Sequence, residues 1–181
     1  MVLNNFNTMT TDFKPSTSKM LASFSETIWT QFGATIDMFE NAVKMCPEEQ
    51  WEKPPFWYKA LHAAFWLDYY LTTKPDSFSP PAPFTTSEFD PAGKLPERKY
   101  TREEILAYIK SSRKKLHDVL KNFSEEIALG HWVNPDRDVT YFDMLLHNMR
   151  HLQHHTAQLN LGLRQSIDNA PPWVERTKIK M

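Results

Sequence analysis

Glycine is scarce in this chain, and this scarcity limits the folds that the chain can adopt. Only 4 of the 181 residues are glycine, which is about 2 % against a usual content of about 7 %. Tight turns between strands and phosphate-binding loops need glycine, because glycine adopts positive φ angles without steric cost. The composition therefore disfavours a turn-rich all-β fold and a glycine-rich nucleotide site.

Two segments in the first half of the chain have the apolar spacing of amphipathic helices. The first begins near Ser18 and ends before Pro47. Its apolar face recurs at steps of three or four residues: Leu21, Phe24, Ile28, Phe32, Ile36, Phe39 and Val43. The second opens at Pro54 and Pro55, a favourable place for proline in a helix, and continues to about Thr72.

Two further helices are marked by capping sequences at their starts. Thr101 and Glu104 have the spacing of a capping box, and the helix that follows is expected to reach about Phe123. A similar pattern from Thr140 opens a fourth helix that runs to about Gln165. We expect a turn region at 130–138. Six of the 13 prolines lie in residues 75–96, which predicts a long irregular connection there.

Four helices without a clear strand pattern predict an all-α fold, specifically a four-helix bundle. The long connection would allow the second and third helices to be non-adjacent or parallel. The expected organisation is a flexible N-terminal arm at 1–16, one bundle domain at 17–167 and a non-helical C-terminal tail at 168–181.

The cysteine content and the apolar stretches predict a reduced, cytoplasmic location. Cys46 is the only cysteine, which excludes an intrachain disulfide and a cysteine-based zinc cluster. The N-terminal sequence lacks the basic and apolar regions of a signal peptide. The longest stretch free of acidic and basic residues, 151–163, is too short to span a bilayer.

The charge of the chain gives no broad electrostatic case for nucleic-acid binding. The formal net charge is −1, whereas nucleic-acid binding domains are typically basic. One basic run, Lys110, Arg113, Lys114 and Lys115, is interpreted as the solvated face of the third helix, because no aromatic residues are interleaved with it.

The histidines carry the distinctive chemistry of the chain. Four of the seven lie within nine residues, at 147, 151, 154 and 155. Residues four apart share one side of a helix and can chelate one ion. On a helical wheel, His151 and His155 lie nearest the apolar stripe, whereas His147 and His154 point further outward. We expect His117 and His131 to be surface residues.

A third ligand must come from another helix, and His62 is the natural candidate. It lies on the aromatic face of the second helix, and a lone histidine in such a setting more often makes hydrogen bonds within a core. If the second and fourth helices pack together, His62, His151 and His155 could converge. Three histidines with open coordination positions are typical of a catalytic metal site.

Other common metal motifs are absent from the sequence. No Glu-x-x-His pair of the di-iron bundles occurs. A zincin would have glutamate at position 152, where this chain has Leu152. No Cys-x-x-Cys-His motif for covalent haem is present.

The histidine segments resemble the DinB-like superfamily of four-helix bundles, also called YfiT-like metalloenzymes and unrelated to the polymerase of the same name. The resemblance rests on Leu61-His62-Ala-Ala-Phe-Trp66 and on the segment from His151 to Leu159, and it covers about residues 18–165. The family pattern ends in His-His-Arg-Gly-Gln-Leu. Here Thr156 and Ala157 replace the arginine and glycine.

The resemblance implies a divalent metal bound by His62, His151 and His155. It also implies metal-dependent hydrolysis, or transfer or isomerisation with a low-molecular-weight thiol, and it allows a homodimer. Zn²⁺, Ni²⁺ and Fe²⁺ all suit imidazole, and such an ion lowers the pKa of a water or thiol bound to it. The substrate would be a small molecule.

Other features of the expected site have structural interpretations. Asp68 and Asp143 are candidate bases by proximity alone, and are expected to face solvent or cap a helix. The neighbouring aromatic side chains could form an apolar pocket, although core packing is the simpler interpretation for most of them: Trp57, Tyr58, Phe65, Trp66 and Tyr69. The competing hypothesis is a non-enzymatic helical bundle that binds a metal or a small ligand.

Overall fold

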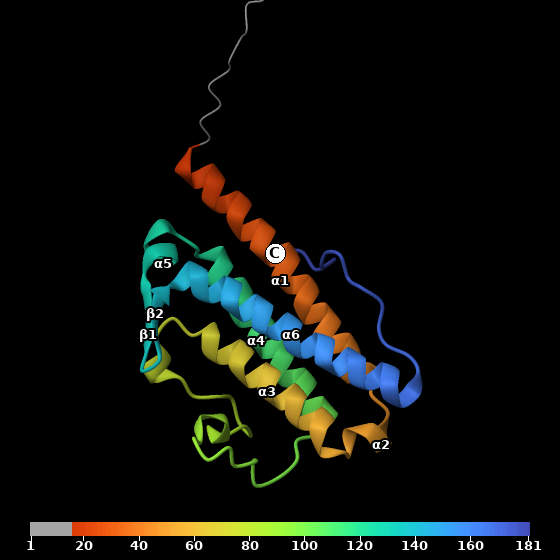
Figure 1. Ribbon diagram of the computed structural model, residues 1–181. Helices are drawn as coiled ribbons and strands as arrows, with labels where there is room; N and C mark the ends of the chain where they lie inside the picture. The colour runs from red at the N-terminus through yellow and green to blue at the C-terminus, as the bar shows by residue number, and fades with distance from the viewer. Residues whose placement is uncertain (1–15) are drawn as a thin grey trace, which may run out of the picture.

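The computed structural model of the protein describes residues 16–181, so the expected arm at 1–16 lies almost entirely outside the described residues. The described part is mainly helical, as expected, and its long helices are α1 (Thr17–Met45), α3 (Pro54–Tyr70), α4 (Arg102–Lys121) and α6 (Tyr141–Ile167) (Figure 1). The shorter elements are α2 (Glu48–Trp51), α5 (Glu125–Leu129), the 3₁₀ turns η1 (Pro75–Ser77) and η2 (Ser87–Phe89), and the strands β1 (His131–Asn134) and β2 (Arg137–Thr140).

The four long helices pack in a closed arrangement. Helix α1 contacts α4 and α6, and α3 contacts the same two helices. Helices α3 and α4 are therefore neighbours, and Figure 1 shows that they run in the same direction, opposite to α1 and α6. The connection between α3 and α4 must return along the length of the helices, which explains why it is long.

Helix α1 presents its expected apolar face to the core over most of its length. Phe32, Ile36, Phe39 and Val43 are completely buried. Phe24 belongs to the same stripe but is 44 % exposed, because the first turns of α1 extend past the other helices (Figure 1).

Both expected helix caps are present. In α4 the Glu104 N–H donates to Thr101 Oγ1 at 3.2 Å, and the Thr101 N–H donates to Glu104 Oε2 at 2.8 Å. In α6 the Asp143 N–H donates to Thr140 Oγ1 at 3.2 Å. These bonds satisfy backbone donors that have no partner inside the helix, which fixes where each helix starts.

The expected turn region at 130–138 lies in a short two-stranded hairpin, a small addition to a fold that is otherwise helical in the described residues. Strands β1 and β2 pair antiparallel, with Trp132 opposite Val139. The Trp132 side chain is fully buried, and its Nε1–H donates to the carbonyl oxygen of Thr72 at 2.9 Å. Strands of four residues are too short to show a clear alternating pattern in sequence.

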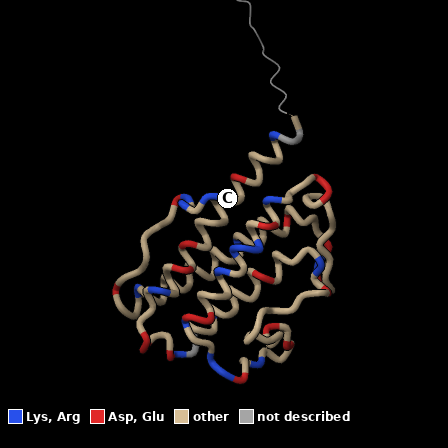
Figure 2. Tube along the Cα trace, turned by 180° about the vertical axis from the view of Figure 1, so that it is seen from behind, with Lys and Arg blue, Asp and Glu red and all other residues tan. Residues whose placement is uncertain are grey.

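The basic run on α4 is a solvated face only in part, since Lys110 and Lys114 are exposed, as expected, whereas Arg113 and Lys115 are not. Arg113 is buried and pairs with Asp37 at 2.6 Å and Glu40 at 3.3 Å. Lys115 pairs with Asp68, and Lys114 with Asp118, each at 2.6 Å. Figure 2, which views the molecule from behind, shows acidic and basic residues interspersed along the chain. The described chain therefore shows no broad basic face in this view.

The C-terminal residues 169–181 contain no helix and lie partly along α1. The Thr177 N–H donates to the Thr30 carbonyl at 3.2 Å, and Trp29 Nε1–H donates to the Ile179 carbonyl at 2.7 Å. These contacts attach the tail to the helix.

Within residues 16–181, every helix falls short of the combined length and hydropathy that crossing a membrane requires.

Candidate metal centre

Three histidines from two packed helices lie together in the described part of the chain. Helix α3 supplies His62, and successive turns of α6 supply His151 and His155. One ring nitrogen from each lies within 4.8 Å of the others, and all three residues are half-buried. The structure thus brings together the three residues that the sequence selected; that they bind a metal stays a prediction.

The spacing and chemistry of these nitrogens fit a divalent ion. Nε2 of His151 lies 3.1 Å from Nε2 of His155. Two nitrogens on one ion, each about 2.0–2.1 Å from it, lie about 2.9–3.4 Å apart at octahedral or tetrahedral angles. The donor set therefore fits a bound cation.

The orientation of His62 is set by Glu88, which sequence reasoning missed. Nδ1 of His62 lies 2.7 Å from Oε2 of Glu88, so it donates to the carboxylate and leaves Nε2 free as a ligand. The Glu88 side chain is only 3 % exposed. Trp66 Nε1–H donates to the same oxygen at 3.2 Å, and Oε1 of Glu88 is buried without a hydrogen-bond partner.

Glu88 lies in η2, within the irregular connection between α3 and α4. This connection has no periodic pattern that relates residue 88 to residue 62. The only signal in the sequence was the length of the loop, since long loops inside small domains often have functions.

A second side chain orients His155. Its Nδ1 lies 3.1 Å from Oε1 of Gln158, which can only accept, so the imidazole donates there and directs Nε2 toward His151. The amide nitrogen of Gln158 lies 2.9 Å from Nε2 of His154. Hydrogen bonds of this kind fix the ring and tautomer of a metal-binding histidine.

Two of the clustered histidines are held in the neutral form. The pKa of His151 is lowered to about 3, mainly by burial and to a lesser extent by the charge of His155 and other nearby histidines. The pKa of His155 is lowered to about 4, mainly by burial and to a lesser extent by the charge of His62. Only a neutral imidazole has the lone pair that a metal needs, so these rings are ready to bind an ion at neutral pH.

The other histidines take no part in the cluster. His154 is exposed, as expected, and so is His131, which pairs with Asp138 at 2.5 Å. His147 is less outward than expected, since it is half-buried and its ring lies 6.2 Å from that of His151. His117 is half-buried against Trp29, at 5.6 Å between ring centres.

The two aspartates considered as bases have other roles. Asp68 is buried rather than solvent-facing, pairs with Lys115 at 2.6 Å and accepts from the Tyr108 hydroxyl at 3.1 Å. Asp143 is exposed in the first turn of α6.

Cys46 is buried, and this burial raises the pKa of its thiol to about 11, so it is a poor nucleophile.

Most of the neighbouring aromatic side chains are core residues. Trp57, Phe65 and Tyr69 are buried. Tyr58 and Trp66 are half-buried and face Glu88. The pKa of Tyr58 is raised, mainly by burial and to a lesser extent by the negative charge of Glu88. The aromatic residues therefore pack the core, and two of them also surround the carboxylate that holds His62.

These features define a mainly helical protein with a three-histidine cluster between two packed helices. The family model of the DinB superfamily matches residues 31–159, and the chain belongs to this superfamily. The matched segment includes His62, His151 and His155, together with Glu88 and Gln158. No curated protein matches the chain significantly.

Proposed function

We propose that this protein is a divalent-metal-dependent enzyme with a four-helix bundle of the DinB-like type. Its three-histidine site would activate water or a low-molecular-weight thiol toward a small-molecule substrate, as in a hydrolase or a thiol S-transferase. The observation that carries the proposal is the approach of three imidazole nitrogens to within 4.8 Å of one another.

Each residue of the site has a distinct part in this proposal. His62, His151 and His155 would hold the ion, and three protein ligands leave a position for a reactant. When bound, the ion supplies Lewis acidity, which lowers the pKa of water or a thiol toward neutrality. Glu88 and Gln158 hold His62 and His155 in the ligating orientation. Tyr58 and Trp66 shield the Glu88 carboxylate from water.

The donor set leaves the identity of the ion open. Zn²⁺, Ni²⁺ and Fe²⁺ all bind imidazole well. No cysteine or carboxylate completes the cluster of the described residues. Competition among the three ions in vitro would rank them for this site.

Metal-dependent turnover of general probes tests the proposal. Hydrolysis of 4-nitrophenyl acetate reports on activated water, and conjugation of a small thiol with 1-chloro-2,4-dinitrobenzene reports on an activated thiol. We expect at least one rate to rise with added ion in the wild type and not in His155→Ala. His117→Ala, which changes a histidine outside the cluster, is the control.

Equal rates with and without the ion, in a wild type that binds it, would contradict the enzymatic proposal. That result would favour the competing function, a helical bundle that binds a metal without catalysis.

A further inference from the structure

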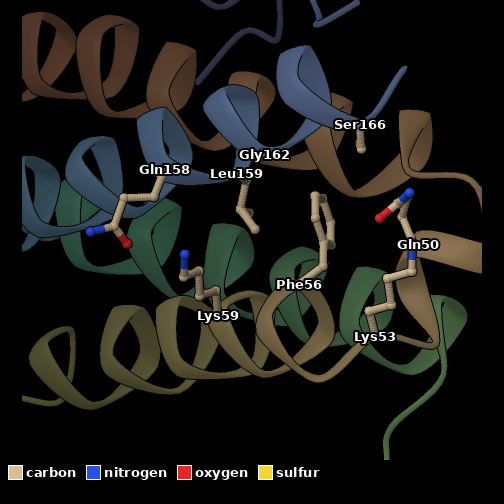
Figure 3. A pocket seen from close by; sticks show the side chains of 8 residues that line it. All are labelled: Gln50, Lys53, Phe56, Lys59, Gln158, Leu159, Gly162 and Ser166. Atoms are coloured by element: carbon tan, nitrogen blue, oxygen red, sulfur yellow. The ribbon is translucent and has the colours of Figure 1, made fainter. Parts of the chain in front are cut away.

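A small cavity lies between α3 and α6, beside the histidine cluster. Its walls include Phe56 and Lys59 from α3 and Gln158 and Leu159 from α6 (Figure 3). The cavity has a volume of about 190 Å³. At about 30 Å³ of liquid volume per water molecule, this space corresponds to roughly six waters, which suits a short organic molecule.

The cavity adjoins the cluster on both helices. Lys59 lies three residues before His62 on α3, and Gln158 lies three residues after His155 on α6. Residues three apart are neighbours on one side of a helix. Gln158 both lines the cavity and accepts the hydrogen bond from Nδ1 of His155, so one side chain separates the cavity from a candidate ligand.

The charge of the cavity wall is positive. Lys53 and Lys59 line it together with the uncharged polar residues Gln50, Gln158 and Ser166, and no acidic residue of the described chain belongs to the wall. Neither lysine forms an ion pair with another residue in 16–181, although Lys59 is half-buried. A half-buried lysine without a counterion favours an anionic ligand.

The middle of the cavity is apolar. Figure 3 shows Phe56 and Leu159 between the Lys59–Gln158 end and the Lys53–Gln50 end. Phe56 and Leu159 are both buried in the core, at 8 % and 1 % exposed. Gly162 also lines this space, and a Cβ atom placed there would contact nothing within 4 Å.

We propose that this cavity binds a small organic anion, with its carboxylate at Lys59 and its short apolar body against Phe56 and Leu159. The cavity lies one side chain from the candidate metal centre, so an anion bound there could be a substrate; this role as a substrate site rests on the proposed function. The anion-binding itself is independent of any reaction, and so is its test.

Titration with hexanoate, followed by calorimetry or NMR, tests the proposal on the full chain. Hexanoate carries one carboxylate and a short apolar body, and 1-hexanol is its uncharged counterpart. We expect hexanoate to bind at least fivefold more tightly than 1-hexanol. The affinity for hexanoate should fall as salt is added, because the interaction is partly ionic.

Three variants separate the features of the cavity. Lys59→Gln should weaken hexanoate binding at least fivefold, and Lys53→Gln less, because Lys53 is exposed. Gly162→Leu should abolish the binding by filling the space, and leucine is the better helix former, so the fold is kept. Lys110→Gln removes the same charge from an exposed position of α4 and should change nothing.

A further variant distinguishes this proposal from the proposed function. His155→Ala should lose the ion but still bind hexanoate, which also excludes direct binding of the carboxylate to the metal. Equal affinity for hexanoate and 1-hexanol, unchanged binding in Gly162→Leu, or equal effects of Lys59→Gln and Lys110→Gln would overturn the anion site. In the wild type, absence of metal binding with hexanoate binding as expected would contradict the proposed function and support the anion site.

Discussion

At the scale of single residues, the histidine cluster depends on side chains that are not themselves ligands. Glu88 accepts from Nδ1 of His62, and Gln158 accepts from Nδ1 of His155. Each bond fixes the tautomer and leaves Nε2 for an ion. The carboxylate of Glu88 also places a negative charge beside the site, which favours a bound cation.

Glu88→Gln tests the role of this carboxylate. The variant keeps the shape of the side chain but removes its charge, so we expect metal affinity to fall by about 10–100-fold while the fold is unchanged. Competition with a chromogenic chelator measures the affinity. Glu97→Gln, at an exposed position of the same loop, should bind the ion as the wild type does; equal affinities in both variants would refute the role of Glu88.

The neutral histidines predict how the metal-free protein responds to acid. The pKa values of His151 and His155 are lowered to about 3 and about 4, whereas in an unfolded chain they lie near 6.5. Between about pH 4 and 6.5 the unfolded chain therefore binds protons that the folded chain does not. The free energy of unfolding should rise with pH across this window and become less pH-dependent above it.

Urea unfolding of the chelator-treated protein at several pH values measures this dependence. Replacing both histidines by glutamine should make the rise shallower between pH 4 and 6.5, because the remaining slope comes from other groups. An identical slope in the double variant would show that these histidines do not titrate as described.

At the scale of elements, periodic segments were predictable and the irregular connection was not. Spacing alone placed His151 and His155 on one face of α6, and capping sequences located the starts of α4 and α6. Glu88 reaches His62 through a loop whose path depends on tertiary contacts. The pairing of Arg113 with Asp37, 76 residues away, also depends on how α1 and α4 pack.

The C-terminal tail gives a prediction at the element scale. A Cβ atom at Gly33 would lie 2.6 Å from Cγ2 of Thr177, where the tail crosses α1. Gly33→Ala should displace the tail, because Thr177 is buried and β-branched. Trypsin should then cleave after Arg176 and Lys178 several-fold faster.

Two further variants check the cause of this displacement. Adding Thr177→Ser removes Cγ2 and should restore resistance to trypsin at least in part. Gly162→Ala adds the same methyl group to a helix where nothing lies within 4 Å, and it should leave cleavage of the tail unchanged. Rapid cleavage in both glycine variants would point to a cause other than this contact.

At the scale of the whole molecule, stability comes from the core that the four long helices share. Helix α1 packs against α4 and α6, and its phenylalanines differ strongly in burial along its length. Phe39 is completely buried, whereas Phe24 is 44 % exposed near the protruding end.

This difference provides a matched pair of substitutions. Phe39→Ala should lower the free energy of unfolding by about 3–5 kcal/mol, because it removes a fully buried ring and leaves a cavity. Phe24→Ala should cost less than about 1 kcal/mol, since surface substitutions have small effects. Chemical denaturation measures both, and similar costs would contradict this arrangement of α1.

The central claim is that three histidines from α3 and α6 bind one divalent ion, and metal content tests it most directly. Protein loaded with Zn²⁺, Ni²⁺ or Fe²⁺ and then desalted should keep about one ion per chain. His62→Ala, His151→Ala and His155→Ala should each lose it, while His154→Ala, at an exposed position beside the cluster, should keep it. A folded wild type that retains none of the three ions, or equal retention in all four variants, would contradict the account.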